Sequence, residues 1–276
     1  MSSPITNSSG RAGRNLPAAT AVGVGLLALV SVTLFWLRPA FVLIAMAASV
    51  LAVRELSNAL QRHDRRVVRE VAYPAAALIP VISYLYSPEI SLGVFAITVV
   101  VLAAVRLGRG FQGYFDDLAA SVLVIAYVPL LVGFATAMSR GTSGAERVIV
   151  MVLLTAGNDT GGYAAGVIFG KHPIAAAISP KKSWEGLAGS LLAQGLLGAL
   201  VVPMLLPVAP WQGIAMGLVM SITATIGDFA ESAIKRDLGV KDMGRALPGH
   251  GGFMDRLDSL LVNALVAAAA FRLMGV

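Results

Sequence analysis

Long stretches of apolar residues set the strongest limit on what this chain can fold into. A helix needs about 20 mostly apolar residues to cross the hydrocarbon core of a bilayer. Candidate stretches occupy residues 16–37, 39–53, 71–87, 90–105, 118–139, 148–170, 186–206, 211–230 and 259–274. Only 13% of the 276 residues are charged, whereas soluble proteins carry about 25%. The sequence therefore predicts an all-α, polytopic integral membrane protein with about nine transmembrane helices, and it excludes a soluble enzyme, a disordered protein and a fibrous repeat.

Two segments fit this scheme less simply. Residues 39–53 are short for a full crossing and could form a re-entrant pair with the first helix, which leaves seven to nine crossings open. Residues 1–15 are polar and rich in Ser and Gly, which predicts a disordered tail.

The loops between the predicted helices differ in charge. With a cytoplasmic N-terminus and nine crossings, 17 of the 21 Lys and Arg residues fall on the cytoplasmic side, and the other four, Arg38, Arg140, Arg147 and Arg272, fall outside. Cytoplasmic loops of membrane proteins are enriched in Lys and Arg, so this asymmetry favours an N-terminus inside the cell. The net charge of +6 then reflects anionic membrane lipid rather than nucleic acid as a partner. The Ala-rich chain fits a bacterial inner (plasma) membrane.

Carboxylates occur within or next to several apolar stretches, where an ionisable group costs several kcal/mol unless it faces a polar cavity or a partner. They are Asp159, Asp228, Glu231, Asp255 and Asp258. Any one of them could belong to a structural ion pair between helices. Asp159, however, is surrounded by Asn, Thr and Gly residues that let a ligand approach closely. Asp255 and Asp258 lie at i and i+3, on one side of the last helix.

The densest polar segment is residues 227–258, which adds cations and a glycine-rich turn to these carboxylates. Its candidate phosphate ligands are Lys235, Arg236, Lys241, Arg256 and the turn residues His250, Gly251 and Gly252. Carboxylate oxygens suit Mg²⁺, which also takes substrate phosphates as ligands, and Lys and Arg suit phosphate oxygens. The segment therefore favours phosphoryl or nucleotidyl transfer at the cytoplasmic surface. A solvated basic loop would explain the cations but not the carboxylates.

A second basic segment covers residues 171–185. Ser179 and Pro180 are typical of a turn, and Lys181 and Lys182 follow. Ser183 could begin the next helix, with Glu185 in its first turn. Taken alone, the segment is explained equally well by a helix cap and a basic loop.

Both segments resemble phosphatidate cytidylyltransferases (CDP-diacylglycerol synthases). The matching residues are Ser232-Ala-Ile-Lys235-Arg236, Lys241-Asp242, Leu247-Pro248-Gly249-His250-Gly251-Gly252 and Asp255-Arg256-Leu-Asp258, together with Asn158-Asp159-Thr160-Gly161 and Ser179-Pro180-Lys181-Lys182-Ser183-Trp184-Glu185-Gly186. The resemblance implies that CTP and phosphatidic acid react to give CDP-diacylglycerol and pyrophosphate. It also implies dependence on Mg²⁺ with room for a second cation, a polytopic helical fold and a homodimer.

Residue roles follow from the pattern and the resemblance together. Candidate metal ligands are Asp228, Asp255, Asp258 and Asp159. Candidate catalytic residues are Asp228, Lys235, Arg236, Asp255 and Arg256. Candidate substrate-binding residues are Ser179, Lys182, Glu185, Lys241, Asp242, His250, Gly251 and Gly252. Residues 16–147 would then be N-terminal transmembrane helices, and residues 148–276 a C-terminal transmembrane catalytic region. Arg62 lies in a basic loop outside both segments, and we expect its removal to be nearly silent.

Two other functions stay open at this point. A CDP-alcohol phosphotransferase-like lipid enzyme would also use membrane-embedded carboxylates, but its D-G-x-x-A-R start is absent. An ion-coupled transporter would use carboxylates near the bilayer midplane, but it has no need for so many cytoplasmic cations beside them.

Overall fold

A computed structural model describes residues 16–244 and 251–276 of the chain. Within these residues the secondary structure is almost entirely helical, with one short hairpin. The helical segments are α1 (Leu16–Trp36), α2 (Arg38–Gln61), α3 (Arg69–Leu85), α4 (Pro88–Leu107), α5 (Tyr114–Ile125), the π-helical η1 (Ala126–Leu130), α6 (Leu131–Met138), α7 (Gly144–Phe169), α8 (Trp184–Leu205), α9 (Pro210–Asp237) and α10 (Met254–Met274). The antiparallel strands are β1 (Pro173–Ala175) and β2 (Ser179–Ser183).

Six helical segments of the described residues are long and apolar enough to cross a membrane. They are α2, α4, the continuous rod Tyr114–Met138, α8, α9 and α10. This confirms the predicted all-α integral membrane protein. Each of the nine apolar stretches is helical, but three are not among these six. In α1 only Leu27–Trp36 counts as an apolar helix, α3 has 17 residues, and α7 carries several polar groups, so length and composition alone do not make these three clear crossings.

The second helix differs from its prediction. Residues 39–53 were expected to be short, yet α2 has 24 residues and continues to Gln61. The prediction ended the span at the first charged residue, Arg54, whereas the helix continues through Arg54 and Glu55 towards the polar end of the molecule. A full-length helix removes the reason for a re-entrant pair with α1.

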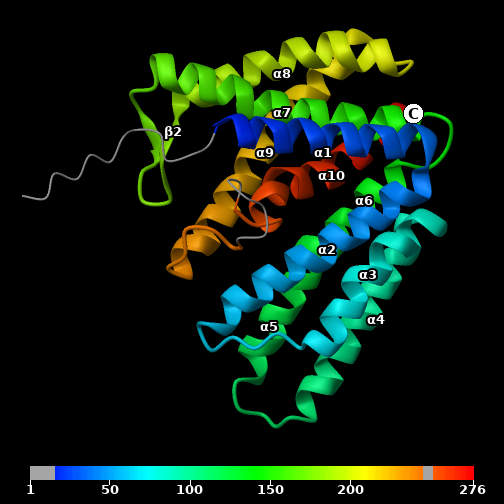
Figure 1. Ribbon diagram of the computed structural model, residues 1–276, viewed down its shortest axis with the longest axis vertical. Helices are drawn as coiled ribbons and strands as arrows, with labels where there is room; N and C mark the ends of the chain where they lie inside the picture. Colours follow the sequence, from blue (N-terminus) through cyan, green and yellow to red (C-terminus); the bar gives the residue numbers. More distant parts are fainter. Residues whose placement is uncertain (1–15, 245–250) are drawn as a thin grey trace, which may run out of the picture.

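The helices form two groups that meet at α10. Figure 1 shows α2 to α6 lying side by side, with α3 packed against α2, α4 and α6. In the second group, α8 packs between α7 and α9, and α9 packs against α10. Because α10 also contacts α2, α6 and α7, its N-terminal end lies where both groups can contribute side chains.

Close packing of backbones holds the second group together. At the α8–α9 crossing, a Cβ on Gly198 or on Gly213 would collide with the carbonyl oxygen of the other residue. Between α7 and α8, Gly161 packs in the same way against Gly189 and Ala193. Small residues let membrane helices approach closely and gain van der Waals contact where no hydrophobic driving force acts. This packing fixes the middle of α7, which carries Asp159.

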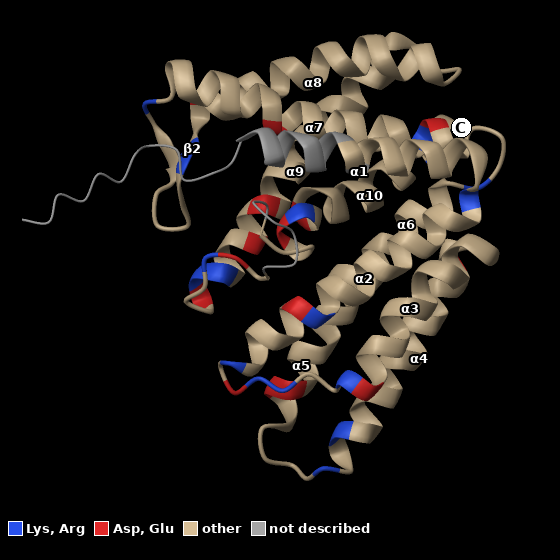
Figure 2. Ribbon diagram, in the orientation of Figure 1, with Lys and Arg blue, Asp and Glu red and all other residues tan. Residues whose placement is uncertain are grey.

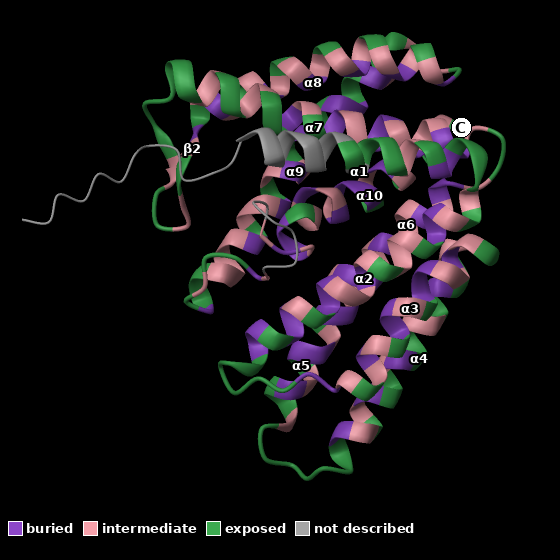
Figure 3. Cartoon of the chain, viewed as in Figure 1, coloured by how far each residue is buried: buried purple, intermediate pink, exposed green. Residues whose placement is uncertain are grey.

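Burial and charge are distributed as expected for a protein in lipid. On α8, Leu192, Leu196, Leu200 and Met204 are 66–83% exposed, and their spacing of four residues places them along one side of the helix. Figure 3 shows exposed residues along α8. Charged residues gather mainly at the end of the molecule that carries the hairpin and the α9–α10 connection (Figure 2). At this end, Arg106 and Asp117 form an ion pair at 2.8 Å, with about 8% of each side chain exposed.

The opposite end holds a small set of arginines that close the loops there. Arg38 donates to the carbonyl oxygen of Gly141 at 2.5 Å, and Arg140 donates to that of Tyr86. Arg147 in turn donates to the carbonyl oxygen of Arg140. Arg272 pairs with Glu89 at 2.5 Å. These four are the basic residues that the sequence assigned to the outer side, and the structure places them together.

Candidate active site

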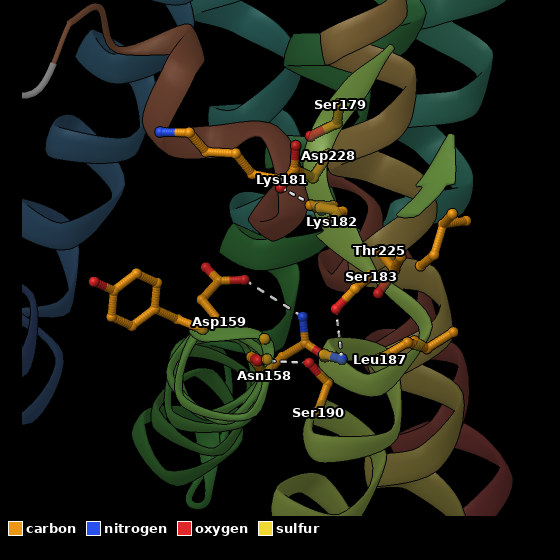
Figure 4. Close-up of a pocket in the computed structure, with 15 residues that line it drawn as sticks. Asn158, Asp159, Ser179, Lys181, Lys182, Ser183, Leu187, Ser190, Thr225 and Asp228 are labelled. Carbon is orange, nitrogen blue, oxygen red and sulfur yellow. Dashed lines mark hydrogen bonds and ion pairs between the residues drawn. The ribbon is translucent and has the colours of Figure 1, made fainter. Parts of the chain in front are cut away.

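A polar cavity of about 310 Å³ brings the two sequence segments together. It lies between α7, the hairpin, α8 and α9. Its polar lining includes Asn158, Asp159, Ser179, Lys182, Thr225 and Asp228. Figure 4 shows Asp159 on one side of the cavity and the side chains of Lys182 and Asp228 on the other. Four of the predicted site residues therefore share one cavity, although they come from three separate segments of the sequence.

The pair of Lys182 and Asp228 joins the hairpin to α9. Lys182 Nζ lies 2.5 Å from Asp228 Oδ2, and a little under a third of each side chain is exposed. Ser232 donates to the other oxygen of Asp228 at 3.2 Å, and Lys182 Nζ also lies 4.9 Å from the ring centroid of Phe229. A half-buried cation held in this way can neutralise an incoming phosphate.

Asp159 is positioned by the residue before it. Asn158 Nδ2 donates to Asp159 Oδ1 at 3.4 Å. Asn158 itself is fixed by two helices, because Ser221 of α9 donates to its Oδ1 at 2.7 Å and Ser190 of α8 donates to its carbonyl oxygen at 2.8 Å. These bonds connect the carboxylate of α7 to both neighbouring helices and limit its movement.

A second charged cluster lies farther along α9. Lys235 forms ion pairs with Glu231, which is fully buried, and with Asp255 at 3.1 Å. Asp255 Oδ2 also accepts the backbone N–H of Met243 at 3.0 Å and that of Gly252 at 2.9 Å. The carboxylate thus ties both ends of the α9–α10 connection to Lys235. It does not line the first cavity, so its predicted role as a metal ligand stays a prediction beside this anchoring role.

Glu55 was missed by the sequence analysis. Its Oε2 accepts the N–H of Met254, the first residue of α10, at 3.0 Å. Its carboxylate also packs against Gly244 and Gly252, where a Cβ would collide with it. A carboxylate at a helix N-terminus satisfies an unpaired N–H and interacts well with the helix dipole. The available signal was a charged residue just beyond a predicted span, which looked like an ordinary loop residue.

Several predicted residues hold the hairpin instead of facing the cavity. Glu185 pairs with His172 at 2.5 Å and accepts the N–H of Lys171 at 3.1 Å, so it anchors the start of the hairpin to α8. Arg236 donates to the carbonyl oxygen of Ile178 in the hairpin turn at 3.2 Å. That turn precedes Ser179, which lies in β2, so the prediction of a turn at Ser179 is displaced by a few residues.

The remaining candidates lie around the start of α10. Asp258 accepts the N–H of Ser259 at 2.6 Å, and Arg256 is exposed in the same first turns. Gly251 has a φ of +83°, which only glycine adopts easily, so the backbone requires glycine at this position. The predicted close approach of substrate to the Gly251–Gly252 turn stays a prediction. His250, predicted to bind substrate, lies outside the described residues.

A larger polar cavity, of about 700 Å³, lies between α2 and the residues after α9. Its charged lining consists of Arg54, Glu55, Arg62, Lys241 and Asp242. Met243 borders this cavity, and its N–H binds Asp255, the partner of Lys235. Arg62 shares the cavity with Lys241 and is therefore not the remote residue that the sequence suggested.

The carboxylates suit Mg²⁺ that is bound together with substrate phosphates better than Mg²⁺ held by protein ligands alone. No group of three or more His, Asp or Glu side chains within residues 16–244 and 251–276 is arranged to hold an ion jointly. Asp159, Asp228 and Asp258 are nevertheless close enough to interact electrostatically. Mg²⁺ is usually held by one or two carboxylates together with water and substrate phosphates. The donor set fits that mode and not a dedicated protein cage.

A family model described as the cytidylyltransferase family matches residues 17–274. The chain belongs to this family. A phosphatidate cytidylyltransferase of Mycobacterium leprae is 38% identical over 95% of this chain and 89% of its own length. Another, of Mycobacterium tuberculosis strain H37Rv, is 38% identical over 96% of this chain and 84% of its own. The resemblance seen in the two segments is thereby confirmed.

A more distant relative matches a smaller part. The phosphatidate cytidylyltransferase of Staphylococcus saprophyticus is 37% identical over 53% of this chain and 56% of its own length. The family match, in contrast, includes the N-terminal helices. The N-terminal helices of this chain include α2, whose Glu55 contacts the start of α10.

Proposed function

We propose that this chain transfers the cytidylyl group of CTP to phosphatidate, giving CDP-diacylglycerol and pyrophosphate. The observation that carries the proposal is the shared cavity of Asp159, Ser179, Lys182 and Asp228, in a chain that is 38% identical to a phosphatidate cytidylyltransferase over 95% of its length. An apolar helical body suits a lipid substrate, and a cavity of cations and carboxylates suits its phosphate and that of a nucleotide.

The reaction requires little covalent chemistry from the protein. A phosphate oxygen of phosphatidate attacks the α-phosphorus of CTP, a new phosphoanhydride bond forms, and the bond between the α- and β-phosphates breaks to release pyrophosphate. Catalysis of such transfers rests mainly on positioning and on neutralising charge. We assign the lipid phosphate to Lys182 and Ser179, which line the cavity, and charge neutralisation between the two substrates to Lys235, which pairs with Asp255.

Mg²⁺ completes this proposal. Asp228, Asp159 and Asp258 would hold it, because at least one oxygen of each carries a single hydrogen bond or none among the described contacts. Asp255 remains a candidate ligand of Mg²⁺. A second cation also belongs to the proposal. When bound, the ion would neutralise phosphate charge beside the cations of the protein. Asp255 would have to give up bonds to Lys235 or to backbone N–H groups in order to join it.

We further propose nine crossings, a cytoplasmic N-terminus and an active site that faces the cytoplasm. The four arginines that close the opposite end support this orientation, since cytoplasmic ends of membrane proteins carry the larger share of Lys and Arg. The membrane would be the plasma membrane of a bacterium. A homodimer belongs to the proposal through the family resemblance.

The deciding experiment is an assay in detergent with CTP labelled at the α-phosphate, phosphatidate and Mg²⁺. We expect the label to move into a lipid that migrates as CDP-diacylglycerol, with release of pyrophosphate. A Lys182→Ala variant should lose most of this activity, whereas Arg109→Ala should retain it, because Arg109 pairs with Glu70 on an exposed surface. No labelled lipid from the wild-type protein would refute the proposal.

A further inference from the structure

We propose that the cavity between α2 and residues 240–244 is a polyphosphate site, which binds the β- and γ-phosphates of the nucleotide and then the pyrophosphate product. This inference rests on the proposed function. It adds Arg54 and Arg62, on and just after α2, to a site otherwise built from the C-terminal half. At about 700 Å³ the cavity lies within the usual range of small-molecule sites.

Unpaired cations are the first observation. Arg54, Arg62 and Lys241 all line the cavity and are exposed, and none has an ion-pair partner among the residues that the structure describes. Nearby arginines differ, because Arg65 pairs with Asp237 at 3.0 Å and Arg109 pairs with Glu70 at 3.0 Å. Three cations that point into one cavity without partners form a site for an anion of high charge.

The carboxylates of the cavity do not cancel this charge. Glu55 is turned towards Met254 N and the two glycines, so its charge serves the start of α10. Asp242 lines the cavity and is exposed. With both counted, the lining retains a net positive charge, and the guanidinium groups can each make two hydrogen bonds to a phosphate.

The second observation is the position of the larger cavity relative to the smaller one. Met243 lines the larger cavity, and its N–H binds the Asp255 carboxylate that pairs with Lys235. Asp228, which lines the smaller cavity, lies two turns before Lys235 on α9. A nucleotide whose α-phosphate lies near Lys235 can therefore extend its outer phosphates towards Arg54 and Arg62, while the lipid phosphate approaches from the side of Lys182.

The same cations could instead bind the phosphate of a lipid headgroup, since both ligands offer anionic oxygens. The experiment therefore uses three probes on purified protein in detergent: inorganic pyrophosphate and CTP by calorimetry, and kinetic titration of CTP and of phosphatidate separately. The variants are Arg54→Ala, Arg62→Ala and the double variant. Arg54→Lys with Arg62→Lys retains the charge and tests for bidentate contacts, and Arg109→Ala is the control.

We expect the double alanine variant to weaken pyrophosphate binding and to raise the KM for CTP by at least about tenfold, since charged hydrogen bonds each contribute on the order of a factor of ten or more. The KM for phosphatidate should not change, and the lysine variant should recover only part of the loss. Unchanged pyrophosphate affinity, or a rise in KM for phosphatidate alone, would overturn the inference. If the wild-type protein binds pyrophosphate and Arg62→Ala weakens this binding, but the wild-type protein makes no CDP-diacylglycerol, the proposed function is refuted. The polyphosphate site then still stands.

Discussion

Glu55 connects the N-terminal helices to the reaction centre, and its replacement tests that connection directly. The structure gives its carboxylate a hydrogen bond to Met254 N at 3.0 Å, close contact with Gly244 and Gly252, and a place at the N-terminus of α10. Glu55→Gln retains an oxygen that can accept the N–H but removes the charge. Glu55→Ala removes both and leaves space between the two glycines.

The size of each effect follows from these contacts. Loss of the charge at a partly buried helix N-terminus costs about 1–2 kcal/mol, and loss of the charged hydrogen bond costs about 1.5–3 kcal/mol. Gly252 N binds Asp255, so displacement of this turn also disturbs the Lys235–Asp255 pair. We therefore expect kcat to fall about tenfold in Glu55→Gln and about a hundredfold in Glu55→Ala, because each 1.4 kcal/mol corresponds to a factor of ten.

The assay is CDP-diacylglycerol formation at saturating substrates, together with thermal unfolding in detergent. Glu70→Gln is the matched control, since Glu70 lies at the same end of the molecule but pairs with Arg109 on an exposed surface. Exposed pairs of this kind contribute little, so the control should resemble wild type in both measurements. Wild-type kcat and unfolding temperature in Glu55→Ala would show that the contact with α10 has no part in positioning the site.

Four further predictions follow from other contacts. Asp255→Asn should lower turnover at least a hundredfold through loss of the Lys235 pair, and recovery at high Mg²⁺ would assign Asp255 to the metal instead. Asp117→Ala should destabilise the fold by about 3–5 kcal/mol, measured by thermal or denaturant unfolding, because it leaves Arg106 buried without its partner. In a double-mutant cycle, Lys182→Ala and Asp228→Asn should be non-additive in kcat/KM; additive losses would mean that the pair does not act as a unit. Lys241→Cys, in a chain without cysteine, should be labelled only from the cytoplasm; labelling by an impermeant reagent from outside would reverse the topology.

The helices could be predicted from the sequence because their signal is local. Each apolar stretch by itself predicts a helix. The start of α8 at Ser183 was also predicted, and the Oγ of Ser183 accepts the N–H of Gly186 at 3.1 Å. The boundary of α2 was wrong because hydropathy marks the edge of the membrane and not the end of the helix. A helix can continue into the polar region, and α2 does so from Arg54 to Gln61.

The site could be predicted only in part, because its geometry depends on contacts between distant segments. The residue types at Asp159, Lys182 and Asp228 indicated phosphate chemistry, and the structure brings them to one cavity. Their pairing does not follow from spacing, since Lys182 and Asp228 belong to different elements. Spacing also gives no sign that Glu185 pairs with His172 of the hairpin, or that Arg62 and Lys241 line one cavity. These contacts depend on how the hairpin and α2 pack.

The arrangement of charges suggests how two anionic substrates can meet in this protein. Phosphatidate and CTP repel each other, so the protein must place cations on both sides of the reacting phosphorus and between the two phosphates. Lys182 lines the smaller cavity, and Arg54, Arg62 and Lys241 line the larger one. Lys235 follows Asp228 of the smaller cavity by two turns of α9 and pairs with Asp255. The two inner lysines are paired with carboxylates, which avoids an uncompensated charge at depth. The outer cations need no such partner, because they lie at the polar end, where they can attract the nucleotide before the lipid phosphate attacks.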